Sequence, residues 1–181
     1  MLAHLRQDYR HLASLRNRSG FVFATELLLL DNGFQAVALY RLSRWFKCRR
    51  IPFFGAACAR LSIALTGVDI NPNADLGPGL VISHGVGLVV GGGVISGRDL
   101  LLHHQVTLGA PTTSRIGQVP RIGDGVAIGA GALVIGAIEI GDRAFVGAGT
   151  LITRDVPAGA KLTARGDRET STESSTPAVP P

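Results

Sequence analysis

The chain has 181 residues, of which 46% are hydrophobic, so it can form one domain with a substantial core but has little room for a second. Its 18 Lys and Arg against 13 Asp and Glu give a net charge of +5, which favours anionic partners such as phosphorylated cofactors, nucleic acid or acidic lipid. The opening residues MLAHLRQDYRHL are charged throughout and lack the apolar run of a signal peptide, so we expect a cytoplasmic protein.

Residues 1–66 are predicted to be helical, with apolar side chains at helical spacing in two stretches. These side chains are Leu2, Leu5, Tyr9 and Leu12, then Val37, Tyr40, Leu42 and Trp45. We interpret Asn32-Gly33 and Ile51-Pro52 as breaks between helices. The basic residues concentrate in this region, but nucleic-acid binding is disfavoured because the cluster is confined to a predicted helix and the repeat region that follows lacks an aromatic stacking platform.

The most apolar stretch of the chain, residues 51–65, is too short to span a bilayer, which takes about 20 residues, and Arg60 interrupts it. We therefore expect no transmembrane segment. A basic segment with aromatic residues at 45, 46, 53 and 54 could lie on a membrane surface, but such stretches are more often helices packed on their own protein. Cys48 and Cys58 have no metal-type spacing and are interpreted as reduced thiols.

Aliphatic residues recur at every sixth position of the middle region, in two phased runs. The first run is Ile70, Leu76, Ile82, Leu88, Val94, Leu100 and Val106, and the second is Ile122, Ile128, Val134, Ile140, Val146 and Ile152. A period of six fits neither an α-helix nor a simple strand, but it fits a three-sided parallel β-helix in which about 18 residues make one coil. We predict a left-handed parallel β-helix over residues 67–160.

Two further expectations follow from this repeat. Leu100 should stack on Ile82, one coil away. The interval from Val106 to Ile122 is longer than two repeats, so residues 109–120 should leave the coil as a loop. The N-terminal helices are expected to cover one open end of the solenoid, and the tail at 166–181, which has almost no apolar residues, is expected to be disordered.

Four motifs within this repeat carry a family resemblance. They are Val68-Asp69-Ile70-Asn71-Pro72, Ile82-Ser83-His84-Gly85, Val106-Thr107-Leu108-Gly109 and Ile128-Gly129-Ala130-Gly131-Ala132. In this order they resemble the hexapeptide acyltransferases, and specifically the serine acetyltransferase branch, over about residues 67–157. The resemblance implies transfer of acetyl from acetyl-CoA to a hydroxyl of L-serine or a similar small acceptor. It also implies a homotrimer with acetyl-CoA in the cleft between neighbouring β-helices.

The resemblance makes His84 the general base and Asp69 the residue that orients it. A neutral imidazole, with a pKa of about 6.5, can take a proton from an attacking hydroxyl at pH 7. Asp69 precedes the inward-facing Ile70, so its side chain should face outward, and the two partners can come from different faces or chains. Direct transfer would follow, without a covalent acyl-enzyme.

His103 and His104 fall about one coil after His84 and are candidate acceptor-binding residues. Repeat geometry gives His103 a corner and His104 an inward position, whereas alignment with polysaccharide acetyltransferases of this branch favours His104. We weight functional and structural interpretations of the pair equally. Zinc-dependent carbonic anhydrases also share this fold and bind their metal with histidines, but an adjacent pair lacks the spacing of that site, so no metal is expected.

Several departures from the serine acetyltransferase pattern bear on the acceptor. The family loop contains Arg-His-Pro where this chain has Gln118-Val119-Pro120, Ser83 stands where an aspartate precedes the catalytic histidine, and Gly92 replaces an acidic residue. Those groups help to bind L-serine, and Arg115 or Arg121 is a candidate substitute for the missing arginine. A sugar or exopolysaccharide precursor is therefore an alternative acceptor, and a non-catalytic scaffold is a further alternative.

Four small residues match the positions at which the family lets CoA approach the backbone. They are Gly109, Ala110, Ala130 and Ala148. Tight corners of a β-helix demand small residues for structural reasons as well, so each position has two interpretations.

Overall fold

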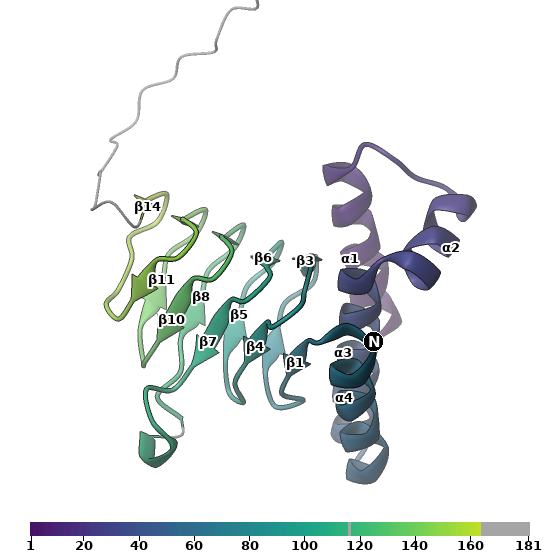
Figure 1. The fold of residues 1–181 in the computed structure, drawn as a ribbon, viewed down its shortest axis with the longest axis horizontal. Coiled ribbons are helices and arrows are strands. Elements are labelled where there is room, and N and C mark those ends of the chain that lie inside the picture. Colours follow the sequence, from purple (N-terminus) through teal and green to yellow (C-terminus); the bar gives the residue numbers. More distant parts are fainter. Residues whose placement is uncertain (116, 164–181) are drawn as a thin grey trace, which may run out of the picture.

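Helices form the N-terminal third of the protein, and short strands form the rest of the described chain (Figure 1). The computed structural model describes residues 1–115 and 117–163, so the tail predicted at 166–181 lies outside the described residues. The helices are α1 (Leu2–Leu15), α2 (Phe21–Leu30), α3 (Asn32–Cys48) and α4 (Pro52–Thr66).

The helix boundaries follow from capping residues. Asp31 caps α3, because its Oδ1 accepts a hydrogen bond of 2.7 Å from the Phe34 N–H. The break predicted at Asn32-Gly33 is present: α2 ends at Leu30, the chain bends by 85°, and Asn32 and Gly33 form the first turn of α3. The break predicted at Ile51-Pro52 is confirmed, and α4 ends at Gly67, whose φ of 68° is the left-handed conformation of a helix C-cap.

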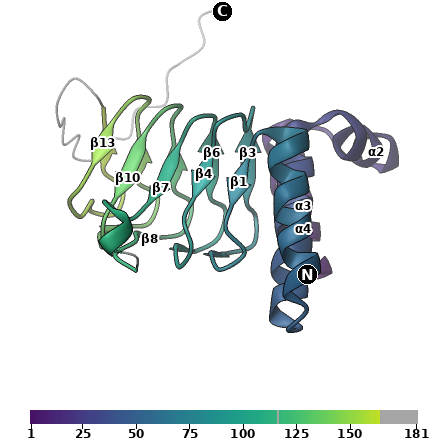
Figure 2. The ribbon, with the colours of Figure 1, turned by 60° about the horizontal axis from the view of Figure 1, so that its bottom comes forward.

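From residue 69 the chain winds into a parallel β-helix of three sheets, confirming the predicted solenoid (Figure 2). Sheet A contains β1 (Asp69–Ile70), β4 (Val89–Val90), β7 (Thr107–Gly109), β10 (Leu133–Ile135) and β13 (Leu151–Ile152). Sheet B contains β2 (Asp75–Leu76), β5 (Ile95–Ser96), β8 (Arg121–Ile122) and β11 (Glu139–Ile140). Sheet C contains β3 (Val81–Ser83), β6 (Leu101–His103), β9 (Ala127–Ile128), β12 (Phe145–Val146) and β14 (Lys161–Leu162).

The coils differ in length. Asp69 pairs with Val89 and Val89 pairs with Thr107, so the first coil is two residues longer than the second. Thr107 in turn pairs with Leu133, and this third coil is the longest of the three because the chain leaves it between β7 and β8. The predicted loop is therefore present and includes a 3-10 turn at Thr113–Arg115. The coil that contains the loop is longer than the interval between Val106 and Ile122 predicted.

The stacking prediction for Leu100 was wrong by two residues. Ile82 stacks on Leu102, since the first coil contains two extra residues. Leu100 is nevertheless buried, with 1% of its surface exposed. Each coil has two sets of inward-facing residues. One set lies in the strands, as Ile82 does, the other lies two positions earlier, as Leu80 does, and each set repeats every six residues.

The helices close the end of the β-helix at which β2 and β3 are the outermost strands (Figure 1). Ala36, Val37 and Tyr40 of α3 are buried and continue the aliphatic core of the coils. The Tyr40 hydroxyl donates to the Ala74 carbonyl at 2.9 Å and accepts from the Leu76 N–H at 3.1 Å. The open end is therefore filled by apolar packing and by hydrogen bonds to its backbone.

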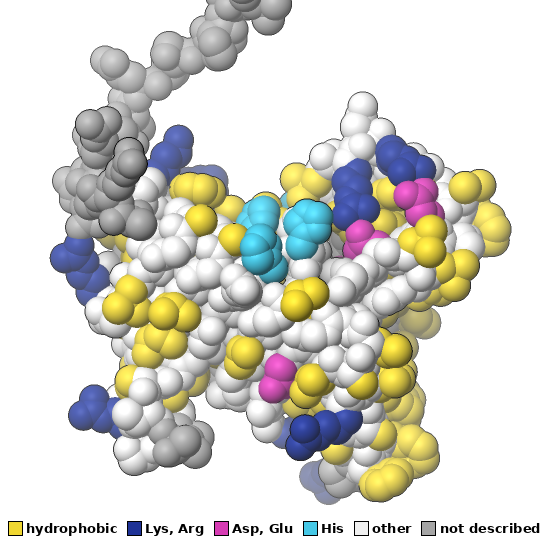
Figure 3. Space-filling model, in the orientation of Figure 1, with side chains coloured by type: hydrophobic (Ala, Val, Ile, Leu, Met, Phe, Trp, Pro, Cys, Tyr) yellow, Lys and Arg dark blue, Asp and Glu magenta, His cyan; other side chains and the backbone are white. Residues whose placement is uncertain are grey.

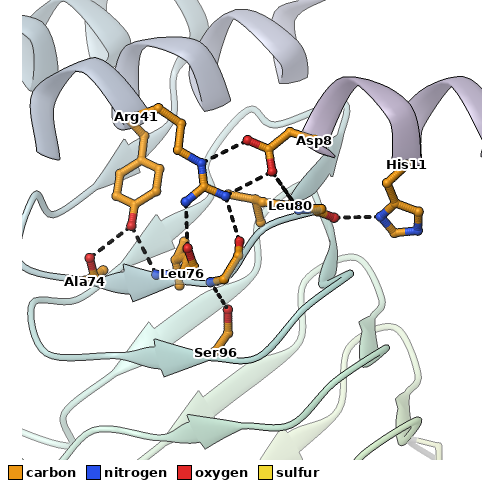
Figure 4. Close-up of polar contacts among 10 residues, drawn as sticks. Asp8, His11, Arg41, Ala74, Leu76, Leu80 and Ser96 are labelled. Carbon is orange, nitrogen blue, oxygen red and sulfur yellow. Dashed lines mark hydrogen bonds and ion pairs between the residues drawn. The ribbon is translucent and has the colours of Figure 1, made fainter. Parts of the chain in front are cut away.

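A buried ion pair completes this cap (Figure 4). Arg41 donates through Nε and Nη2 to the Asp8 carboxylate at 2.9 Å, and the two residues are 4% and 1% exposed. Arg41 also donates to the Leu76 and Gly77 carbonyls at 2.6 and 2.7 Å, while Asp8 Oδ1 accepts from two backbone N–H groups, those of residues 79 and 80, at 2.8 Å. One ion pair thus links α1, α3 and the backbone of the first coil.

Within the described residues, no single helix is both long and apolar enough to cross a membrane. Together α2 and α3 would reach that length and apolarity, but the chain bends by 85° between them. Most of one face of α3 is moreover buried against the β-helix.

We predict that Arg41→Met lowers the free energy of unfolding by about 3–5 kcal/mol, because it leaves the Asp8 carboxylate buried without its partner. The measurement is urea unfolding followed by circular dichroism. Asp8→Asn/Arg41→Met should lose less than the sum of the two single variants, since it removes the orphaned charge.

Arg18→Met is the matched control, because Arg18 also pairs with a carboxylate, Glu26, but on the surface. It should change stability little. Equal losses for Arg18→Met and Arg41→Met would contradict the structural role given to the buried pair.

Candidate active site

The corner between sheets C and A in the first coil contains the two extra residues, His84 and Gly85. Ser83, just before them, is in register with His103 of the next coil. The carbonyl of Val86, just after them, accepts a hydrogen bond from the Gln105 N–H of the next coil. The later C–A corners make the same backbone hydrogen bond. The insertion is therefore confined to His84 and Gly85.

The inserted residues have an unusual backbone. The φ angles of His84 and Gly85 are 62° and 25°, both in the region that favours glycine. Glycine is needed at 85 for space as well, because a Cβ there would lie 2.7 Å from Cγ2 of Val68. Gly85 is buried while His84 is exposed, so the insertion presents an imidazole outward from a rigid corner.

Helix α3 packs directly against this corner. A Cβ at Gly33 would overlap the Ile82 carbonyl oxygen, so glycine allows the first turn of α3 to reach the end of β3. The adjacent Asn32 has a buried side-chain oxygen without a hydrogen-bond partner, and that oxygen lies 3.5 Å from where a Gly85 Cβ would be. Sequence reasoning missed Asn32, because Asn-Gly was interpreted only as a break.

The imidazole next to His84 is that of His104. Their ring centroids are 6.4 Å apart in an edge-to-face arrangement, and His104 Nδ1 is buried without a partner. The predicted corner position for His103 was wrong, because the two-residue insertion shifts the register: His103 ends β6 within sheet C. Burial first, and then the neighbouring His104 and His84, lower the pKa of His103 below its ordinary value.

His103 lines a separate cavity of roughly 250 Å³ between sheet C and α1. Ser83 lies beside it in the cavity wall, and Leu12, Leu15 and Arg16 of α1 form the opposite wall. The histidines are visible together on the surface above β3 and β6 (Figure 3). This edge of the β-helix therefore presents imidazoles both to solvent and to a small cavity.

Two of the predicted cofactor residues continue the same corner. Because Leu102 stacks on Ile128, the corner residue His104 lies one coil before Ala130. The Gly149 N–H donates in turn to the Ala130 carbonyl at 2.8 Å, which puts Ala148 at the same corner of the following coil. The C–A corner thus carries histidines near the helical cap and small residues farther along.

The remaining predicted residues lie at the other end of sheet A. Gly109 ends β7, Ala110 begins the loop, and Arg121 begins β8 of sheet B after the loop returns. Within one chain these three residues are therefore separated from the histidine corner by the width of sheet A.

Asp69 begins β1 with an exposed side chain, as predicted. It lines a cavity of roughly 410 Å³ between β1 and α4, together with Asn71, Lys47 and Arg60. In the part of the chain that the structure describes, no hydrogen bond or ion pair joins Asp69 to His84. Across residues 1–115 and 117–163, no group of three or more His, Cys, Asp or Glu side chains is arranged to hold a metal.

Comparisons with known proteins agree with this architecture. Residues 120–154 match the family model described as bacterial transferase hexapeptide (six repeats). The chain is 39% identical over 143 residues to a serine acetyltransferase of Helicobacter pylori, covering 79% of this chain and 82% of that protein. It is 41% identical over 133 residues to a serine acetyltransferase of Synechococcus elongatus, covering 74% of this chain but only 54% of that longer protein.

The crystal structure of serine acetyltransferase from Brucella abortus in complex with coenzyme A superposes with a TM-score of 0.83 at 30% identity, over 95% of this chain and 68% of that one. Sequence and structure agree along the helices as well as the coils, so the chain belongs to the serine acetyltransferase family of hexapeptide-repeat proteins.

Proposed function

We propose that the protein is an acetyl-CoA-dependent O-acetyltransferase of serine acetyltransferase type, which acetylates a hydroxyl of L-serine or a similar small acceptor. The observation that carries this proposal is the His84 insertion, which presents an exposed imidazole at a corner already shaped by α3 and by a second imidazole, His104. The named activity of the relatives and the coenzyme A complex of the Brucella protein support the same chemistry.

In the proposed reaction, His84 takes the proton of the acceptor hydroxyl while that oxygen attacks the thioester carbonyl of acetyl-CoA. The new C–O bond forms, the C–S bond breaks, and the imidazolium returns the proton to the departing CoA thiolate. His104 supports this site through its ring, which lies edge-to-face with that of His84 at 6.4 Å between centroids. All steps use the acceptor, the donor and one histidine.

The proposed assembly is a homotrimer, which brings together the two edges that are separate in one chain. The C–A corner carries His84, His104 and the small Ala130 and Ala148, while Gly109 lies at the A–B corner. Chains packed side by side would put an A–B corner of one against the C–A corner of the next. Asp69 of a neighbouring chain can then orient His84, which has no carboxylate partner within its own described chain.

A sugar hydroxyl is a second candidate acceptor, and the loop between β7 and β8 favours it. Val119 stands where the family resemblance predicts a histidine, and its side chain packs against the core, 3.4 Å from where a Gly93 Cβ would be. An apolar, inward-packed residue cannot bind the charged groups of an amino acid. Sugar hydroxyls need no such charge partner.

We predict that His84→Ala lowers kcat about 10²–10⁴-fold, the usual contribution of a general base. Release of CoA thiol from acetyl-CoA measures turnover, and analytical ultracentrifugation with circular dichroism checks that the assembly and fold are retained. Turnover near that of the wild type would remove His84 from the mechanism.

Offering L-serine and a panel of sugars separately in the same assay identifies the acceptor. Thiol release with L-serine alone is expected for a serine acetyltransferase, and release with a sugar alone for the second candidate. If no acceptor releases thiol although the purified protein is a folded trimer, the result would argue for the non-catalytic scaffold.

His104→Ala and His103→Ala form a matched pair, because the substitutions are identical and the residues adjacent. Since the His104 ring lies edge-to-face with the His84 ring while His103 lines the separate cavity, we predict that His104→Ala lowers kcat/KM about 10- to 100-fold, as for loss of one buried hydrogen bond. His103→Ala should change it far less. The reverse order would contradict the register described above.

A further inference from the structure

The turn between α3 and α4 forms an aromatic-basic foot, consisting of Trp45, Phe46, Phe53 and Phe54 with the cations Lys47, Arg49 and Arg50. Neighbouring rings contact one another: Trp45 and Phe46 at 5.0 Å, Phe46 and Phe54 at 5.5 Å, and Phe54 and Phe53 at 5.7 Å between centroids. The sequence-based expectation that these rings pack on their own protein holds only for the first two, because Phe53 and Phe54 are 77% and 54% exposed.

The foot is strongly cationic. Residues 32–66 contain six Lys and Arg and no Asp or Glu. Arg41 and Arg44 pair with carboxylates of other segments, at Asp8 and Asp75. The other four, Lys47, Arg49, Arg50 and Arg60, have no ion pair to any carboxylate among the residues described. Arg49 lies over the Trp45 ring at 5.1 Å, so cations and rings share one surface.

The apolar surface continues from the foot along α4. Among the α4 side chains that the structure describes, the buried positions are Gly55, Ser62 and Thr66. Phe53, Ala57, Leu61 and Leu65 recur every four residues and are all exposed, so they form a stripe directed away from the packed face.

Helix α2 adds a second exposed apolar surface. It is held by Phe23 and Leu27, while Phe21, Leu29 and Leu30 are 86%, 66% and 80% exposed. Hydrophobic side chains consequently line the outer margin of the helical cap, on the side away from the β-helix, from α2 down to the far end of α3 and α4 (Figure 3).

The charge of this surface selects among its possible occupants. A second copy of the same face would bring unpaired cations against identical cations, which is repulsive. A bilayer containing anionic lipid offers negative headgroups to Lys47, Arg49, Arg50 and Arg60 and a hydrocarbon boundary to the exposed phenylalanines and leucines. Aromatic rings flanked by cations are also well suited to the water–lipid interface.

We propose that the outer face of the helical cap binds the surface of an anionic membrane, with the aromatic-basic foot as its main contact. The protein lies on the bilayer and does not span it, consistent with the 85° bend between α2 and α3. The β-helix and its histidine corner extend away from the lipid. This inference is independent of which acceptor the enzyme uses.

The first test uses Trp45, which is the only tryptophan of the chain and lies within the foot. The full-length protein is mixed with vesicles of phosphatidylcholine alone or of phosphatidylcholine with phosphatidylglycerol as the minor component. Co-sedimentation and a blue shift of tryptophan emission are expected only with the anionic vesicles, and both should weaken as salt is raised. Equal binding to both vesicles, or no binding to either, overturns the proposal.

Arg49→Glu/Arg50→Glu should lower the partition coefficient at least about tenfold, because each cation near an anionic surface contributes roughly a fivefold factor. Arg98→Glu/Arg143→Glu changes the net charge equally on exposed residues of the β-helix and should bind like the wild type. Phe53→Ser/Phe54→Ser tests the apolar contact and should remove the blue shift. Equal losses in the foot and control variants would mean that only net charge matters, against the proposed site.

Self-association is the competing outcome. If the assembly doubles in mass without lipid and the foot variants prevent this doubling, the face belongs to a second copy and the membrane proposal is wrong. Circular dichroism and thiol release from acetyl-CoA by each variant show that loss of lipid binding is not loss of folding, since Arg49, Arg50, Phe53 and Phe54 line neither the cavity beside Asp69 nor the one beside His103.

Discussion

The buried ion pair between Asp8 and Arg41 is the interaction on which the remainder of this structure depends. A parallel β-helix satisfies its backbone groups by bonding each coil to the next, so its first coil has unpaired carbonyl and N–H groups at the open end. Here Arg41 and Asp8 bond to those groups as well as to one another. Burying two charges costs free energy, and the surrounding backbone hydrogen bonds offset that cost.

The same cap determines the surroundings of the candidate site. With α3 held against the first coil, Gly33 reaches the Ile82 carbonyl and Asn32 lies against the inserted corner. Helix α1 forms one wall of the cavity beside His103. The histidine corner is therefore shaped by both the solenoid and the helices.

The fold could be predicted from the sequence because the period of six is unlike that of any common alternative. The register could not, since a coil has two inward-facing sets with the same period, and a slip of two residues exchanges one for the other. In sheet B the residue that stacks on Leu76 is Ser96, which is polar. The aliphatic Val94 and Leu100 belong instead to the inward-facing set two positions before the strand residues. The aliphatic pattern therefore continued without interruption across the insertion.

That error explains which positions in the fold could be predicted for the candidate site residues. His84 follows from a local motif and needs no register, whereas the choice between His103 and His104 depends on the length of the preceding coil. The contribution of Asn32 depends on a contact between segments that are far apart in the chain, and no periodicity within either segment predicts such a contact.

The inserted pair His84-Gly85 has a broader consequence for how such proteins change over evolutionary time. Because the hydrogen bonds of each coil are made only to the coils on either side, two residues were accommodated at a corner while the strands before and after it kept their pairing. An insertion at a corner thus adds a reactive side chain at one particular coil without changing the strand pairing of the other coils. Solenoid enzymes can acquire or relocate chemistry by changing corners, while the buried stack that stabilises them is inherited intact.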